Sequence, residues 1–407
     1  MPDDLAWLVR SGDAGLTGNK VSSKPQLSAA PDKRDHMQKT GRTLTLSAAV
    51  LAALLVPVAA SEARAGWAHQ RKITIDTSAS GANVAGDVRG FPVPVRLDAG
   101  NFDFGQAKPD GADIRFDDAA GRPLPYEIEK WDAAAKRAAI WVRTDVKGNN
   151  ATQSVTLKWG NPAASSESNG AAVFPKADGW ITAHHLAEKG AAAGYRDSVG
   201  NLDGKGVGIT GDATGTGVVG NALSLTRARG EYVLLPGSES SGLFNPLPSK
   251  GTFSIWSNAR THPAAYIAMF AKGETGFRIH YFGEGDQTEP CIDVANYDWC
   301  PLPSGAYTKV KNNTWYHFVF VIDKPNAYYY INGKLEVGKT DTNAWKTTGT
   351  EPVTIGNNEK TPGSNNRKRS FDGLLDEARI LSVPKDRNWA KLDFESQKPG
   401  SKLLRHK

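Results

Sequence analysis

Three acidic residues in one short stretch have the spacing of a hydrolytic site. Glu284, Asp286 and Glu289 form the pattern E-x-D-x-x-E. On a strand, Glu284 and Asp286 would share a face, and a bulge would bring Glu289 to the same side. Two carboxylates about 5 Å apart suit a retaining glycosidase. Gly285 and Pro290 give the stretch the composition of a loop, so a chance acidic loop is the competing interpretation.

Four aromatic residues lie in loop-rich segments of the same half of the chain: Tyr297, Trp299, Tyr307 and Trp345. Exposed aromatic rings stack on sugars because each ring presents an apolar face near polar groups. These residues are therefore our candidate ligand-binding residues. Packing within the loops is the alternative.

Histidines can indicate a metal site, but His184 and His185 are adjacent in an expected strand. Their side chains would point to opposite faces, so we expect one packed and one exposed imidazole. His317 lies within an apolar strand, where we expect a core histidine with satisfied hydrogen bonds.

Glu127 and Glu129 alternate with Tyr126 and Ile128 in another expected strand. The two glutamates share one face, which in a sandwich usually meets solvent. We therefore expect the glutamates on the surface and Tyr126 and Ile128 in the core.

The chain has two cysteines, Cys291 and Cys300. In an exported protein this separation predicts one local disulfide. Two cysteines offer too few ligands for a structural metal site.

The chain of 407 residues has a formal net charge of +6, which is too small and dispersed to predict nucleic-acid binding. It lacks the P-loop, the dinucleotide fingerprint, the G-x-S-x-G elbow and the H-E-x-x-H motif. Its 42 glycines, 23 prolines and many short alternating runs favour an all-β fold.

Residues 37–65 have the pattern of a secretory signal peptide. Met37 begins a basic segment, residues 44–60 are apolar and uncharged, and Ala63-Arg64-Ala65 is an A-x-A cleavage site. A transmembrane helix is the competing interpretation, which Pro57 disfavours.

The mature chain is expected to begin at Gly66, and residues 1–36 to be a mis-annotated upstream extension. We expect an exported protein of the periplasm, the outer envelope or the extracellular space. After signal cleavage it would not be an integral membrane protein.

The segment 314–337 predicts a β-hairpin at the centre of the second half of the chain. Alternating β-formers fill 315–322, and Asp323-Lys-Pro-Asn326 supplies the turn. Both faces of the first strand are apolar, as in a strand inside a sandwich. A helix is expected over 386–394, after Pro384.

Three blocks in this region resemble the laminin-G/concanavalin A-like family. They are Trp315 and His317; Tyr329, Ile331, Asn332 and Gly333; and Phe371, Gly373, Leu375, Asp376, Glu377, Arg379 and Ile380. The resemblance implies a concanavalin A-like jelly roll over residues 178–407. This fold hosts lectins, adhesion modules and glycosidases, so it leaves the function open.

The same resemblance raises calcium as a cofactor, because this fold often binds it through Asp and Asn oxygens of adjacent loops. Asp197, Asn201 and Asp376 are the candidate ligands. The alternative for Asp376 is that it anchors a neighbouring turn.

Residues 66–165 carry about seven short strand signals with regular turns, which predicts a first β-sandwich. Their blocks resemble the bacterial domain of unknown function DUF2341: Arg71–Ile75, Phe91–Val93, Asp110–Phe116, Leu124–Glu129, Ile140–Val142 and Leu157–Asn161. The family is often encoded beside proton-channel components of envelope transport complexes. Residues 166–177 are expected to be a linker.

We therefore expect an all-β protein of two sandwiches, acting as a non-catalytic exported binding protein for glycan or protein ligands at the cell envelope. Two alternatives remain. One is an accessory subunit of a proton-channel-linked transport complex, and the other is a glycoside hydrolase using Glu284, Asp286 and Glu289.

Overall fold

The structure is a computed structural model. It describes residues 66–406 apart from 191–193, 240–241, 245–246, 248, 264–265, 274–275, 283–288, 295–296, 300–308, 341–349 and 359–368. The expected signal segment 37–65 lies outside the described residues. Among the residues described, no helix has the length and apolar character needed to cross a membrane.

The first sandwich consists of two antiparallel sheets. One sheet has the order β23-β1-β7-β3-β4 and the other β2-β6-β5. Their strands are β1 His69–Ile75, β2 Val88–Asp98, β3 Arg115–Asp117, β4 Pro123–Leu124, β5 Tyr126–Asp132, β6 Arg137–Val146, β7 Ser154–Trp159 and β23 Leu404–His406. A 3₁₀ turn, η1 (Phe104–Gln106), also contributes Phe104 to the buried core of this sandwich.

The second sandwich is larger and also antiparallel. Its first sheet has the order β10-β11-β22-β13-β18-β19-β20, with β8 paired to β22, and its second has the order β17-β16-β15-β14-β21-β12-β9. The first sheet contains β8 Trp180–His184, β10 Thr214–Thr216, β11 Asn221–Leu225, β13 Lys250–Ala259, β18 Tyr316–Asp323, β19 Asn326–Ile331, β20 Lys334–Thr340 and β22 Gly373–Leu381. The second contains β9 Lys205–Val207, β12 Tyr232–Leu235, β14 Ile267–Ala271, β15 Phe277–Phe282, β16 Glu289–Val294, β17 Tyr297–Trp299 and β21 Val353–Ile355. The predicted all-β fold of two sandwiches is thus confirmed.

Both faces of strand β18 are apolar because each face packs in a buried cluster. Phe318, Phe320 and Ile322 point into the core between the two sheets of the second sandwich. Val319 and Val321 point the other way and join the buried cluster that contains the first-sandwich core. The strand is therefore buried on both sides, as its sequence predicts.

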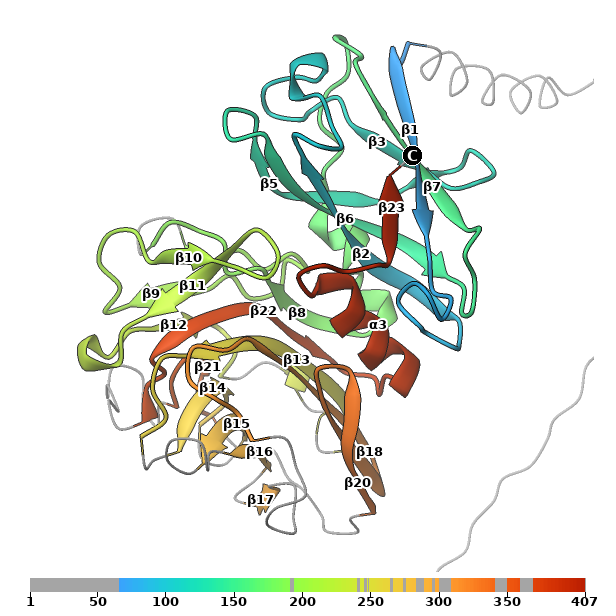
Figure 1. Ribbon diagram of the computed structural model, residues 1–407. Coiled ribbons are helices and arrows are strands. Elements are labelled where there is room, and N and C mark those ends of the chain that lie inside the picture. The colour runs from blue at the N-terminus through green and yellow to red at the C-terminus, as the bar shows by residue number, and fades with distance from the viewer. Residues whose placement is uncertain are drawn as a thin grey trace, which may run out of the picture. The chain divides into compact units, whose positions relative to one another are not determined.

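Helix α3 (Arg387–Gln397) packs against β2 and β20, and so against both sandwiches (Figure 1). Asp386 caps it by accepting a hydrogen bond from the Trp389 backbone N–H at 2.8 Å. Trp389 and Leu392 are buried on this helix, and its presence confirms the helix expected over 386–394.

The chain then returns to the first sandwich. Strand β23 pairs with β1, with Leu404 opposite Ile75 and His406 opposite Ile73, and Figure 1 shows the two side by side. The backbone N–H of Asp76 donates to the Leu403 carbonyl at 2.6 Å. The first sandwich is therefore built from both ends of the described chain, which departs from the expected boundary of the second domain at 178–407.

The expected linker 166–177 is packed rather than free. It holds the short helix α2 (Gly170–Val173), whose N-cap Asn169 donates its backbone N–H to the Tyr126 carbonyl at 2.8 Å. Val173 and Phe174 are fully buried. The remaining short turns are η2 Lys176–Asp178, η3 Arg227–Arg229 and η4 Gly242–Phe244.

Candidate functional site

A groove of about 390 Å³ lies on the outer face of the eight-stranded sheet, beside the start of α3. We call it the tyrosine groove. It is lined by Val321, Asp323, Tyr328, Tyr330, Leu335, Pro384, Lys385, Asp386 and Arg387.

Strand alternation places the two tyrosines together. Tyr328 and Tyr330 share one face of β19, while Tyr329 between them is fully buried in the core of the second sandwich. Leu335 pairs with Tyr330 across β19 and β20 and is 47 % exposed. Gly338 pairs with Tyr328, and a Cβ there would lie 3.1 Å from its ring. The groove therefore has an apolar floor.

Charged groups border this floor. Asp323, Asp386 and Arg387 are exposed, and Asp386 keeps its cap bond to α3. Burial, together with the nearby Asp386 and Tyr328, raises the pKa of Tyr330 to about 12. Tyr330 is therefore a neutral hydroxyl at physiological pH, able to donate and accept hydrogen bonds.

Most residues predicted for ligand binding or catalysis cannot be compared with this site. Tyr307, Trp345, Glu284 and Asp286 lie outside the described residues. Tyr297 and Trp299 belong to β17 and Glu289 to β16, but their side chains lie outside the described part. These assignments stay predictions.

Cys291 lies in β16 and is disulfide-bonded. Cys300, its expected partner, is the only other cysteine in the sequence and lies outside the described residues. The pairing itself stays a prediction.

Two of the candidate calcium ligands, Asp197 and Asn201, form hydrogen bonds with the backbone through their side chains. Asp197 Oδ1 accepts from the N–H groups of Ala183 and Val199, and Oδ2 from those of Asn201 and Leu202. Asn201 donates its side-chain amide to the Ile181 carbonyl at 2.6 Å. A calcium role for these residues stays a prediction.

Asp376 anchors a turn, as one of the two alternatives for it predicts. Its Oδ2 accepts from the backbone N–H groups of Val218 at 2.6 Å and Val219 at 3.1 Å. Burial, with Glu377 and Glu129 nearby, raises its pKa well above the usual range.

A second concentration of functional side chains lies where the two sandwiches meet. We call Glu127, Glu129, His185, Glu377 and Arg379 the junction cluster. The side chains of Glu127 and Glu129 are 3 % and 1 % exposed, so the expectation that they face solvent is wrong. Their strand face is covered by residues that follow β8 and by β22, which the local alternation cannot reveal.

His185 is the centre of the junction cluster. Its Nδ1 lies 3.0 Å from Glu377 Oε1 and 3.9 Å from Glu129 Oε2, and its Nε2 lies 3.3 Å from Glu127 Oε2. Its ring stacks on Trp141 with centroids 5.3 Å apart. His184 is also fully buried, so the expectation of one exposed imidazole is wrong.

The cluster continues into the second sandwich through Arg379. This guanidinium donates to Glu377 and, at 3.0 Å, to Asp393 Oδ1 on α3. Asp393 Oδ2 in turn lies 3.1 Å from Nε2 of His317, which also meets Ser254 Oγ at 3.0 Å. His317 is fully buried, as predicted, but its hydrogen bonds are only partly satisfied: Nε2 is bonded, whereas Nδ1 has no partner among the described residues.

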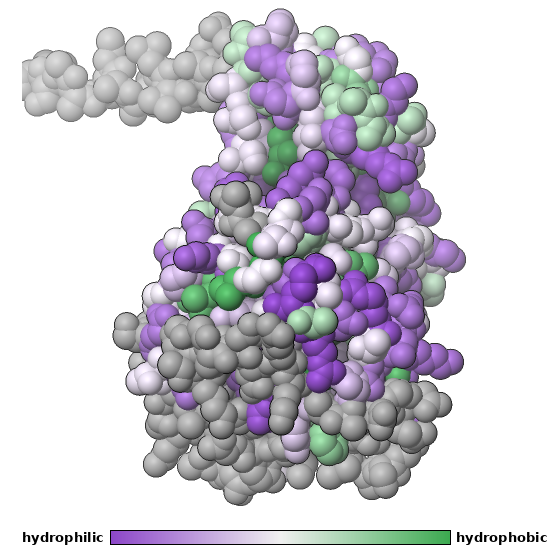
Figure 2. All heavy atoms as spheres, turned by 90° about the vertical axis from the view of Figure 1, so that its left-hand side faces the viewer, coloured by the Kyte–Doolittle hydropathy of each residue, from purple (hydrophilic) through white to green (hydrophobic). Residues whose placement is uncertain are grey.

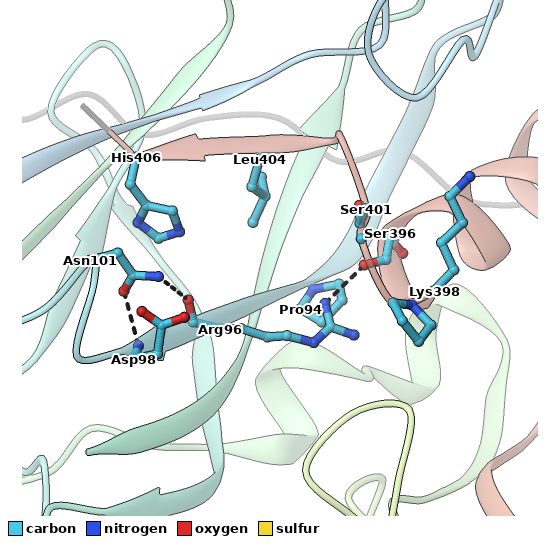
Figure 3. A pocket seen from close by; sticks show the side chains of 11 residues that line it. Pro94, Arg96, Asp98, Asn101, Ser396, Lys398, Ser401, Leu404 and His406 are labelled. Atoms are coloured by element: carbon cyan, nitrogen blue, oxygen red, sulfur yellow. Dashed lines mark hydrogen bonds between the residues drawn. The ribbon is translucent and has the colours of Figure 1, made fainter.

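A second hollow, of about 220 Å³, lies between β2 and the segment after α3. Figure 3 shows Arg96 reaching toward Ser396 and Asn101 bonding to the backbone of Asp98 and Arg96. Arg96 also donates to the Val218 carbonyl at 3.1 Å, so its guanidinium ties three segments together. This arrangement indicates a structural role for Arg96.

One face of the molecule shows how polar and apolar residues are distributed on its surface. In the face shown in Figure 2, hydrophobic residues form small separate groups between hydrophilic ones. Such scattered groups are normal for a protein surface and do not by themselves indicate an interface.

Sequence families match two stretches of the chain. Residues 110–185 match the domain of unknown function DUF2341, and residues 228–388 match the concanavalin A-like lectin/glucanases superfamily. A DUF2341 segment is thus followed by a concanavalin A-like domain. This order agrees with both resemblances in the sequence. The search of curated proteins found no match.

Solved structures similar to the chain include domain 4 of AbnA, a GH43 extracellular arabinanase from Geobacillus stearothermophilus, in complex with arabinotriose. It is 20 % identical, with 54 % of this chain and 100 % of that chain covered and a TM-score of 0.38. The binding domain of Paraclostridial Mosquitocidal Protein 1 is 14 % identical, with 54 % and 52 % covered and a TM-score of 0.42. The botulinum neurotoxin serotype D binding domain is 14 % identical, with 54 % and 52 % covered and a TM-score of 0.37. The chain spans about half the length of these two toxin domains.

Proposed function

We propose that this chain is a non-catalytic glycan-binding protein and that the tyrosine groove of its concanavalin A-like domain holds the saccharide. One observation carries the proposal: two tyrosines on one strand face lie in a groove with carboxylates and a guanidinium at its edge. The concanavalin A-like fold, which hosts lectins among other functions, is consistent with it.

The chemistry of the groove matches a sugar. The ring of Tyr328 is partly exposed and Leu335 is 47 % exposed, so together they offer an apolar platform for a sugar face. Asp323 and Asp386 can accept hydrogen bonds from sugar hydroxyls, and Arg387 can donate to ring or hydroxyl oxygens. A volume of about 390 Å³ falls within the usual range of small-molecule sites.

The non-catalytic part of the proposal rests on where the clustered carboxylates lie. Glu127, Glu129 and Glu377 are at most 3 % exposed. A polysaccharide cannot approach carboxylates buried in this way. Their position therefore argues against a hydrolytic role for this cluster.

Export is part of the same proposal. The expected signal peptide at 37–65 and the disulfide-bonded state of Cys291 both support a location outside the reducing cytoplasm. A glycan of the envelope or its surroundings is the ligand class that such a location provides.

A glycan panel followed by calorimetric titration tests the groove. With the purified protein in chelator, we expect Tyr328→Ala to weaken binding of the best glycan about five- to tenfold, because about 1–1.5 kcal/mol of ring contact is lost. Asp323→Asn should weaken it less.

Tyr266→Ala is the matched control, since Tyr266 is a partly buried tyrosine beside Phe282 near the other sheet of the domain. It should bind as the unchanged protein does. Loss of binding in Tyr266→Ala with full binding in Tyr328→Ala would move the site away from the groove. A panel without any ligand would contradict the proposed function.

A further inference from the structure

We propose that Glu129, His185 and Glu377 form a buried site for one divalent transition-metal ion, with Zn²⁺ as the best-fitting ion. The site lies in the junction cluster and is independent of the tyrosine groove. It joins β5 of the first sandwich to β22 of the second through His185.

The three side chains already converge. Each of the three residues, Glu129, His185 and Glu377, offers one ligand atom. These three atoms all lie within 4.8 Å of one another. Zn²⁺ binds nitrogen and oxygen ligands at about 2.0–2.2 Å, so its ligand atoms lie roughly 3–3.5 Å apart. The distance of 3.0 Å between His185 Nδ1 and Glu377 Oε1 meets this, and Glu129 at 3.9 Å needs a small movement.

The partner on the far side of the imidazole favours this assignment. Glu127 Oε2 lies 3.3 Å from His185 Nε2, and Glu127 Oε1 accepts from Ser198 Oγ at 2.8 Å. A carboxylate there can hold a proton on Nε2. Nδ1 shares its proton with Glu377, and a metal ion bound at Nδ1 would displace that proton. Histidines that bind metals usually have such a carboxylate on the other nitrogen.

An independent observation points to a cation at Glu129. The Glu129 side chain is 1 % exposed, and its Oε1 has no hydrogen-bond partner among the described residues. Its Oε2 accepts one bond from Trp141 Nε1 at 2.8 Å. A buried carboxylate oxygen without a partner is costly unless a cation neutralises it.

The cations near the carboxylates of the junction cluster each have other partners. Arg96 interacts with Glu129 and Glu377 but donates its hydrogen bonds to backbone carbonyls, and His185 lies between Glu127 and Glu377. Arg379 is shared between Glu377 and Asp393. Arg196 approaches Glu127 only to 3.7 Å, and its side chain is 62 % exposed.

The cluster also has room for an added ligand. A cavity of about 120 Å³ is lined by Glu127, Glu129 and His185, with Arg196 and Ser198 also on its wall. A water molecule can therefore occupy the fourth position of a tetrahedral ion. Because one ligand is an imidazole, a borderline ion such as Zn²⁺ fits better than Ca²⁺, which prefers oxygen ligands alone.

Calorimetric titration of the full chain, first stripped with a chelator, tests the site. We expect one Zn²⁺ per chain, bound at least 100-fold more tightly than Ca²⁺. Glu129→Gln and Glu377→Gln keep the side-chain size and should each weaken Zn²⁺ binding at least tenfold. Glu167→Gln removes a carboxylate that is 65 % exposed and should bind as the unchanged protein does.

X-ray absorption of the zinc-loaded, unchanged protein gives a second readout that does not depend on folding of the variants. It should show one imidazole and oxygen ligands, without sulfur. Absence of Zn²⁺ binding, equal binding in Glu129→Gln, or a spectrum with several imidazoles or with sulfur would each overturn the proposal. A proton would then be the cation at Glu129.

Discussion

The guanidinium carbon of Arg379 lies 4.4 Å from the ring centre of Trp141. Arg379 belongs to β22 of the concanavalin A-like domain and Trp141 to β6 of the first sandwich. A fully buried cation of one sandwich thus rests on an aromatic ring of the other, and its charge is balanced by Glu377 and Asp393.

Replacing this cation should destabilise the protein strongly. In Arg379→Met the carboxylates of Glu377 and Asp393 lose their shared buried partner, so we expect the free energy of unfolding to fall by about 3–5 kcal/mol. Urea unfolding followed by tryptophan fluorescence measures the change. Arg122→Met breaks an ion pair whose arginine is 81 % exposed and should cost less than about 1 kcal/mol. Equal losses in the two variants would refute a special role for Arg379.

Gly220 should tolerate no side chain. Its φ is +64°, and an added Cβ would lie 1.9 Å from Glu129 Oε1. Gly220→Ala should therefore lower the free energy of unfolding for two reasons, the positive φ and the contact with Glu129. We expect the contact to add about 1–3 kcal/mol to the loss caused by the positive φ. Gly121→Ala is the matched control, because Gly121 has φ +77° and open space around it. If both variants unfold at the same urea concentration, the contact between residue 220 and Glu129 adds no destabilisation and the prediction is wrong.

Leu403 tests the return of the chain to the first sandwich. It is 1 % exposed and packs in the first-sandwich cluster. Leu403→Ala should cost about 2–5 kcal/mol of unfolding free energy. Leu243→Ala, at a leucine that is 36 % exposed, should cost less than about 1 kcal/mol. A mild effect at Leu403 would indicate that this segment adds little to the first sandwich.

His280 should make stability depend on pH. Burial first, and then Arg278, lowers its pKa to about 3, while the pKa in the unfolded chain is near the ordinary 6.5. Because the unfolded state binds the proton more readily, the contribution of His280 to stability is complete above about pH 6.5 and decreases as the pH falls toward 3.

The measurement compares the unchanged protein with His280→Gln in urea at about pH 7 and about pH 4.5. The unchanged protein should lose roughly 2 kcal/mol more than the variant between these values. Parallel pH profiles would show that His280 is not buried as a neutral ring.

Local patterns were sufficient to predict much of the fold. The hairpin of β18 and β19, the turn at Asp323–Asn326 and the capped helix α3 each depend on residues that are near in sequence. Alternation along β18 also predicted burial on both faces, because each face has its own apolar set.

Neither site followed from such patterns. Glu127 and Glu129 are buried because distant residues cover their strand face, and strand alternation says nothing of what packs on a face. The sequence holds a weak signal of the junction cluster. Ionisable residues occur within expected strands at Glu127, Glu129, His185 and Glu377. The sequence does not distinguish Tyr328 and Tyr330 as ligand-binding residues, because aromatic residues within a strand usually indicate core.

The pairing of β23 with β1 has a consequence for the biogenesis and engineering of the chain. On the ribosome, the sheet that β1 begins cannot be completed until residues 404–406 have been synthesised. The concanavalin A-like domain is therefore inserted within the sequence of the first sandwich and does not simply follow it. Exchanging that domain between proteins would require two splice points, one on each side of it, instead of a single cut near residue 170.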